Sequence, residues 1–225
     1  GFDFPLGYPS EAVKVIAAGK GHKAFREKIS SMLSDDEKNA SNRFEVAGDL
    51  NQTYFPETPM FWGHPQEHVY RGLTPTKPIH GHRRKLELRV TETIAKGAKS
   101  VWQLSGAGCV GSQALLGIKH VSELLKNKRI SEQTNLWPFD FGFMFEESKL
   151  CTIVEIYPSL KIFDGRFSDQ TPNDKRQVMS VSEVFFDLDS QDLLQDHFEP
   201  PHELNPVAVA NAEQSEGWIF GLGIK

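Results

Sequence analysis

This chain of 225 residues has few cysteines, no long apolar run and no excess of positive charge. Its two cysteines, Cys109 and Cys151, are far apart in apolar surroundings, so we expect buried, reduced thiols in a cytoplasmic protein rather than a disulfide framework. No apolar run approaches the roughly 20 residues of a membrane span, and no signal peptide is visible, so we expect no membrane partner. The net charge of −5 argues against a broad nucleic-acid surface but permits a local basic groove.

Apolar residues recur at helical spacing over much of the chain. We expect helices over residues 10–18, 22–33, 34–48, 110–125, 171–186, 190–198 and 207–214. The segment 83–92 is ambiguous, because its alternating leucines suit a strand and the spacing of Leu86 and Val90 suits a helix. The segment 51–82 reads as a long ordered loop, because its aromatic residues require burial.

The clearest strand is the β-branched run from Cys151 to Tyr157, which Pro158 closes. A second buried strand is expected where the sequence begins, at Gly1-Phe-Asp3. Helices between two buried strands are typical of an α/β domain, and 39% hydrophobic residues supply enough apolar surface for one core. We therefore expect a single domain over residues 1–225, with a helix- and loop-rich insertion over about 10–148.

Gly106, Gly108 and Gly111 form a G-x-G-x-x-G sequence that invites comparison with a dinucleotide-binding turn. A helix follows the glycines, but the preceding strand would be the short segment 101–104, and no acid-bearing strand follows near residue 130. We therefore expect the glycines to permit a tight turn or close helix packing.

His64-Pro-Gln-Glu67-His68 matches the H-x-x-E-H pattern of some zinc peptidases. The pattern needs an apolar helix to bring both imidazoles to one metal, whereas this stretch is rich in proline and glycine. Neither histidine of His80-Gly-His82 is an obvious third ligand, so we favour solvated loop histidines.

Arg83, Arg84 and Arg89 form a short basic cluster with Lys85. A solvated face is the simpler interpretation of these residues. Contact with a substrate phosphate is the alternative.

Asp3 and Glu155 each lie where a buried strand ends. The carboxyl ends of adjacent parallel strands meet at one edge of a sheet, where carboxylates can hold Mg²⁺ or Mn²⁺. Glu155 lies between Val154 and Ile156, and a buried charge requires a partner. That partner is either a metal ion or an arginine of the basic cluster. Asp174, in the first turn of the next helix, is either a third metal ligand or a helix-capping acid.

Short stretches over most of the chain form a recognisable set. They are Gly1-Phe-Asp-Phe-Pro-Leu-Gly7, Asn42-Arg-Phe-Glu-Val-Ala47, Pro59-Met-Phe-Trp-Gly63, Lys99-Ser-Val-Trp-Gln-Leu104, Leu136-Trp-Pro-Phe-Asp140, Val154-Glu-Ile-Tyr-Pro158, Asp174-Lys-Arg-Gln-Val178 and Glu216-Gly-Trp-Ile-Phe-Gly221. Together they resemble a bacterial branch of the family called domain of unknown function 429. That family is regarded as predicted nucleases of ribonuclease-H-like fold.

The resemblance implies a mixed sheet flanked by helices, with catalytic acids on strands and on a helix. By position, Asp3 matches the fourth-strand acid, Glu155 matches the acid of the E-x-Y-P stretch, and Asp174 matches the helical acid. The first-strand aspartate of the family is absent, so we expect the sequence to lack the N-terminal strands of such a fold.

Two hypotheses of function follow. The first is a metal-dependent phosphodiester hydrolase in which Asp3, Glu155 and Asp174, with the absent first-strand acid, hold two Mg²⁺ or Mn²⁺ ions. In this hypothesis Arg83, Arg84 or Arg89 holds a nucleic-acid phosphate. The second is a non-catalytic binding or regulatory protein on the same fold, which binds a nucleotide or small phosphorylated ligand near Phe61 and Trp62.

Overall fold

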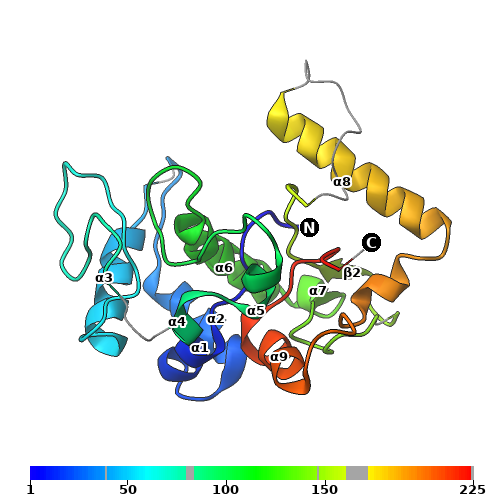
Figure 1. Ribbon diagram of the computed structural model, residues 1–225, viewed down its shortest axis with the longest axis horizontal. Coiled ribbons are helices and arrows are strands. Elements are labelled where there is room, and N and C mark those ends of the chain that lie inside the picture. Colours follow the sequence, from blue (N-terminus) through cyan, green and yellow to red (C-terminus); the bar gives the residue numbers. More distant parts are fainter. Residues whose placement is uncertain (39, 80–83, 146, 161–171, 224–225) are drawn as a thin grey trace.

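The computed structural model describes residues 1–38, 40–79, 84–145, 147–160 and 172–223. Its longer helices are α1 (Ser10–Ile16), α2 (Gly21–Met32), α3 (Arg43–Tyr54), α6 (Gly111–Lys126) and α8 (Asn173–Ser190) (Figure 1). The shorter ones are α4 (Arg84–Glu87), α5 (Val90–Ile94), α7 (Lys128–Ser131), α9 (Pro206–Asn211), the 3₁₀ turn η2 (Gln195–Phe198) and the π-helical turn η3 (Ala212–Glu216). None of the described helices is long and apolar enough to cross a membrane.

The strands are few, short and parallel. β1 (Thr134–Leu136) pairs with β2 (Cys151–Ile153) in the register Thr134↔Cys151. Beyond β2, Glu155 forms parallel bridges with Phe2 and with Ile219. The chain is therefore a helix-rich α/β protein in which the N-terminal and C-terminal segments both join the end of β2. The parallel bridge between Phe2 and Glu155 agrees with neighbouring parallel segments, but the buried strand expected at Gly1-Phe-Asp3 is wrong, because Gly1 and Asp3 are exposed and only Phe2 is paired. The strand expected from Cys151 to Tyr157 ends at Ile153.

The largest apolar core lies among α1, α2, α3 and α6. Its centre is aromatic: the ring of Tyr8 lies 5.2 Å from those of Phe25 and Trp102 and 5.8 Å from that of Phe61. A second cluster around Trp137, Trp218 and the neighbouring phenylalanines packs beside the strands. By contrast, α8 lies at the periphery (Figure 1) and buries only Ser180, Val181 and Val184.

The helices at the N-terminus and after the glycines were predicted close to their observed bounds, but a helix over 34–48 is wrong. Here the Asp36 side chain instead accepts hydrogen bonds from the backbone N–H groups of Lys38 and Ala40. Asn42 accepts a hydrogen bond from the N–H of Ser34, and α3 begins at Arg43. Such side-chain bonds compete with a helix for the backbone donors.

The ambiguous segment before residue 92 is helical where it is described, with α4 and α5 on either side of a two-residue break. The segment 101–104, which a dinucleotide-binding turn would need as a strand, forms none, because the pairing described there is an isolated bridge between Gln103 and Trp62. The burial expected for Cys109 and Cys151 is also wrong: Cys109 is half-buried and Cys151 is exposed.

The long loop after α3 is ordered by Asn51, as its burial and hydrogen bonds show. The Asn51 side chain accepts hydrogen bonds from the N–H groups of Met60 and Phe61 and donates to the carbonyls of Phe61 and Gly72. The predicted burial of Phe55, Met60 and Phe61 is confirmed, since each is at most 2% exposed. These aromatic residues are core, not the wall of a binding site.

The glycines of the G-x-G-x-x-G sequence serve backbone geometry. Gly106 and Gly108 have positive φ values of 111° and 69°. A β-carbon on Gly111, the first residue of α6, would lie 2.5 Å from the carbonyl oxygens of Val101 and Gln103. The start of α6 thus packs against backbone that cannot easily move, as expected for close packing rather than dinucleotide binding.

We predict that Gly111→Ala lowers the free energy of unfolding by about 1–3 kcal/mol, because the added methyl group collides with two backbone carbonyls. Chemical denaturation of the variant measures this loss. The exposed Gln113 of the same helix provides the control, and Gln113→Ala changes stability by less than about 0.5 kcal/mol. Equal stability of the two variants would contradict the packing role of Gly111.

Candidate functional site

A buried ion pair joins Arg89 to Glu155 at the end of β2. Each terminal nitrogen of Arg89 donates one hydrogen bond of 2.7 Å to a different carboxylate oxygen of Glu155. The Glu155 Oε2 atom also accepts a hydrogen bond of 3.0 Å from the backbone N–H of Leu6. The side chains of Arg89 and Glu155 are 1% and 4% exposed. Of the two partners expected for Glu155, the described structure therefore contains the arginine.

Two more glutamates complete this buried network. The Arg89 Nε atom donates to Glu92, and the Glu92 carboxylate accepts in turn from the backbone N–H of Arg89. Arg89 also donates to the backbone carbonyl of Glu216, whose carboxylate accepts from the N–H groups of Ser10 and Val90. The network thus connects α1, α5, β2 and η3 through one guanidinium group.

The charged groups of the network shift one another's pKa values. Although burial opposes the charge of Arg89, the carboxylates of Glu155 and Glu92 raise its pKa above the ordinary value. Burial raises the pKa of Glu92, and the opposing effect of Arg89 does not cancel that rise. Both pKa shifts arise because Arg89 and Glu92 are buried and interact with oppositely charged groups instead of water.

Asp3 lies beside this network but has no cationic partner of its own among the described residues. It follows Phe2, whose backbone N–H donates to Val154 and whose carbonyl accepts from Ile156. A cavity of about 60 Å³, open to solvent, is lined by Asp3 together with Glu155, Arg89, Glu92 and neighbouring residues. Burial raises the pKa of Asp3, and the negative charges of Glu155 and Asp174 raise it further. The site around Asp3 is therefore rich in negative charge.

Asp174 reaches this region from the first turn of α8. The helix begins at Asn173 with Pro172 as its N-cap residue, and no side-chain hydrogen bond caps it. Thr171, where this helix was expected to begin, lies outside the described residues. Asp174 is thus exposed at a helix start and close enough to affect the pKa of Asp3.

The three predicted acids are close enough to interact electrostatically, but they do not form a preformed metal-binding site. Within the described ranges, no three carboxylate, imidazole or thiol side chains are placed to hold one metal ion. Both oxygens of Glu155 already accept hydrogen bonds from Arg89. A cation here would have to rely on Asp3, with water molecules filling the remaining positions, as Mg²⁺ commonly does.

The predicted phosphate contacts need correction at Arg89. Its guanidinium group is buried and hydrogen-bonded to Glu155, Glu92 and the backbone of Glu216, so it is not a solvent-facing phosphate ligand. Arg83 lies outside the described residues. Arg84 begins α4, and its side chain is likewise outside the description.

The sequence did not single out the other residues that line the Asp3 cavity. They are Phe4, Pro5, Ala98, Lys99, Val110, Ile156, Tyr157 and Ile219. Lys99 and Val110 come from the loop before α6, which the sequence associates with the glycines rather than with the acids. No sequence spacing links that loop to Asp3, so only the folded chain reveals it.

The H-x-x-E-H stretch forms a loop in the structure. His64 hydrogen-bonds through Nδ1 to the carbonyl of Pro65, and His68 lies beside the ring of Tyr70. His80 and His82 lie outside the described residues. This geometry agrees with loop histidines and gives no support to a zinc site.

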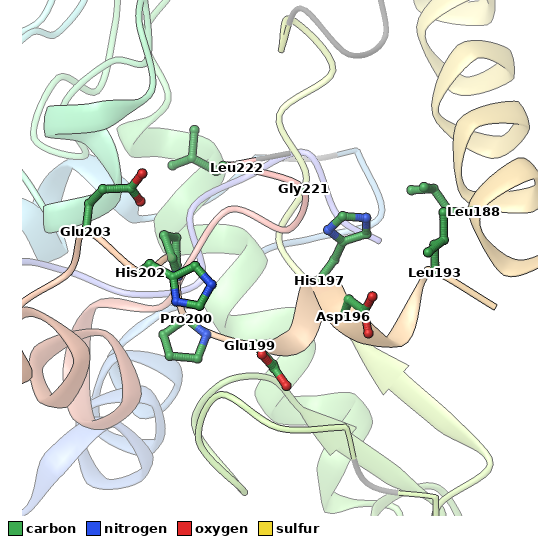
Figure 2. A pocket seen from close by; sticks show the side chains of 12 residues that line it. Leu188, Leu193, Asp196, His197, Glu199, Pro200, His202, Glu203, Gly221 and Leu222 are labelled. Carbon is green, nitrogen blue, oxygen red and sulfur yellow. The ribbon is translucent and has the colours of Figure 1, made fainter. Parts of the chain in front are cut away.

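A larger hollow of about 720 Å³ lies elsewhere, between η2, the end of α8 and the C-terminal segment. Figure 2 shows acidic and imidazole side chains around it, among them Asp196, His197 and Glu203. None of the described residues that line it is a lysine or arginine. The acidic lining repels a phosphorylated ligand. This hollow is therefore not an alternative nucleotide site to the one expected near Phe61 and Trp62.

Comparison with known proteins yields no matching family model, no similar curated protein and no similar solved structure. The resemblance to the family named above therefore stays a prediction that depends on the quoted stretches.

We predict that Arg89→Met lowers the free energy of unfolding by about 3–5 kcal/mol, because it leaves Glu155 and Glu92 buried without a counter-ion. Urea denaturation at neutral pH measures the loss. Lys128, whose pair with Glu132 is exposed, supplies the control, and Lys128→Ala costs less than about 1 kcal/mol. A small loss in Arg89→Met would show that the network is not a structural requirement.

Proposed function

We propose that the chain is a metal-dependent phosphodiester hydrolase with a ribonuclease-H-like arrangement of acids, in which Asp3 is the principal ligand of Mg²⁺ or Mn²⁺. The observation that carries the proposal is the position of Asp3. Its carboxylate lines a cavity, lacks a cationic partner among the described residues, and has a pKa raised by burial and by two further acids. A divalent cation would relieve that accumulation of negative charge.

The roles of the three acids differ in this proposal. Asp3 provides a carboxylate for the cation, and Asp174 adds negative charge from the start of α8. Glu155 is held by Arg89 and adds to the electrostatic environment of Asp3 from one side of the cavity. Both Glu155 oxygens already accept hydrogen bonds, so this geometry fits one hydrated cation better than a two-cation site with three shared carboxylates.

A bound cation would supply an activated water molecule and stabilise the leaving oxygen of a phosphodiester. The protein's own contribution is to hold Asp3 on a backbone that pairs with Glu155 at Phe2 and donates to the Glu155 carboxylate at Leu6. The parallel pairing of the Asp3 segment with the Glu155 segment agrees with the acid-bearing strands that the family resemblance implies.

The alternative of a nucleotide-binding protein lacks its expected site. Phe61 is fully buried in the core, and Trp62 is half-buried and bonded through its backbone to Trp102 and Leu104. We therefore retain the hydrolase as the single proposal.

We predict that Asp3→Asn abolishes Mn²⁺-dependent cleavage of a labelled oligonucleotide and removes the rise in melting temperature caused by Mn²⁺. Loss of the carboxylate removes the principal cation ligand while preserving the size of the side chain. Gel electrophoresis of the products and thermal unfolding with and without Mn²⁺ measure the two effects.

Asp49, an exposed acid on α3, provides the matched control. Asp49→Asn should keep both the cleavage and the Mn²⁺ stabilisation. The proposal fails if the protein shows neither effect, or if Asp3→Asn retains both.

A further inference from the structure

The proposed reaction requires a cation that binds the substrate phosphate, and the arginines predicted for that role do not supply it within the described residues. Arg89 is committed to buried carboxylates. Negatively charged nucleic acid cannot approach Asp3, Glu155 and Asp174 without a compensating positive charge. The question is which described side chain at the cavity provides it.

Lys99 meets this requirement. It lines the same cavity as Asp3 and Glu155, and its side chain is exposed. No ion pair with Lys99 occurs in the part of the chain that the structure describes. Among the described residues that line the cavity, Arg89 and Lys99 are the cations, and only Lys99 is free of a carboxylate partner.

Lys99 lies beside the glycine turn and the start of α6. Its Cε atom lies 3.8 Å from the position of a β-carbon on Gly108, so the stem of Lys99 runs beside the glycine turn. Val110, the N-cap residue of α6, lines the same cavity and provides no side-chain cap. The backbone N–H of Gly111, the first residue of this helix, already donates to the carbonyl of Gln103, so the positive charge offered to a ligand here is that of Lys99.

We infer that Lys99 binds a phosphate of a nucleic-acid backbone next to Asp3. The inference rests on the proposed function and names both its substrate class and the residue that recognises it. Lysine acts as a point charge and recognises phosphate without reading the base. The site therefore accepts phosphodiesters of varied sequence, and the glycine turn contributes by placing Lys99 and α6 beside the acids.

The test is the binding of a short fluorescein-labelled single-stranded oligonucleotide to the full chain in EDTA, where no cleavage occurs. Lys99→Ala should weaken binding about tenfold and reduce the slope of log K against log salt concentration by about 0.7. Lys99→Arg should restore most of the affinity, since it restores the charge. Lys96, an exposed lysine three residues earlier that does not line the cavity, is the control, and Lys96→Ala should bind within about twofold of the unmodified chain.

The outcomes separate this inference from the proposed function. Lys99→Ala should keep its Mn²⁺ stabilisation, because Lys99 is not a metal ligand. If the unmodified chain never cleaves but Lys99→Ala alone loses binding, the phosphate site stands and the hydrolase proposal fails. If the unmodified chain does not bind the oligonucleotide, or if Lys99→Ala binds equally well, the inference is overturned.

Discussion

The buried pair of Arg89 and Glu155 is the constraint on which the rest of this structure depends. Neither charge can lie in the interior unless its hydrogen bonds are satisfied, and each side chain finds its partners on segments distant in sequence. Satisfying them brings the N-terminal segment, the end of β2, α5 and η3 to one point. The described residues form two short strands, and the network joins segments that these strands do not pair.

The same constraint shapes the candidate site. Arg89 occupies both oxygens of Glu155, so Asp3 is the carboxylate left for a cation, and burial and the charges of Glu155 and Asp174 make Asp3 harder to ionise. Because Arg89 is buried, it cannot also bind a substrate, and Lys99 is the residue that we infer binds the phosphate. One interaction thus decides both where a divalent cation is favoured and which residue is available for phosphate. The cavity brings the acids Asp3 and Glu155 together with Lys99 of the loop before α6.

Local patterns predicted the parts of the fold that depend on local physics. Apolar spacing gave α1, α2 and α6, and an acid within an apolar strand correctly indicated that Glu155 needs a buried partner. The choice between a metal and an arginine could not be made, because it depends on the break between α4 and α5 that turns Arg89 inward. The helix expected over 34–48 failed because side-chain hydrogen bonds of Asp36 stabilise a turn. Lys99 was missed because its proximity to Asp3 exists only once distant segments have packed.

The most direct test of this account is the pKa of the Asp3 carboxyl group, measured by carbon-13 NMR during a pH titration of the full chain. The account predicts a pKa above the ordinary aspartate value, and a lower one in Asp174→Asn, since one of the charges that opposes ionisation is then removed. Asp49→Asn should leave the titration of Asp3 unchanged. An ordinary pKa for Asp3 that does not respond to Asp174→Asn would contradict the claim that these carboxylates share one electrostatic site.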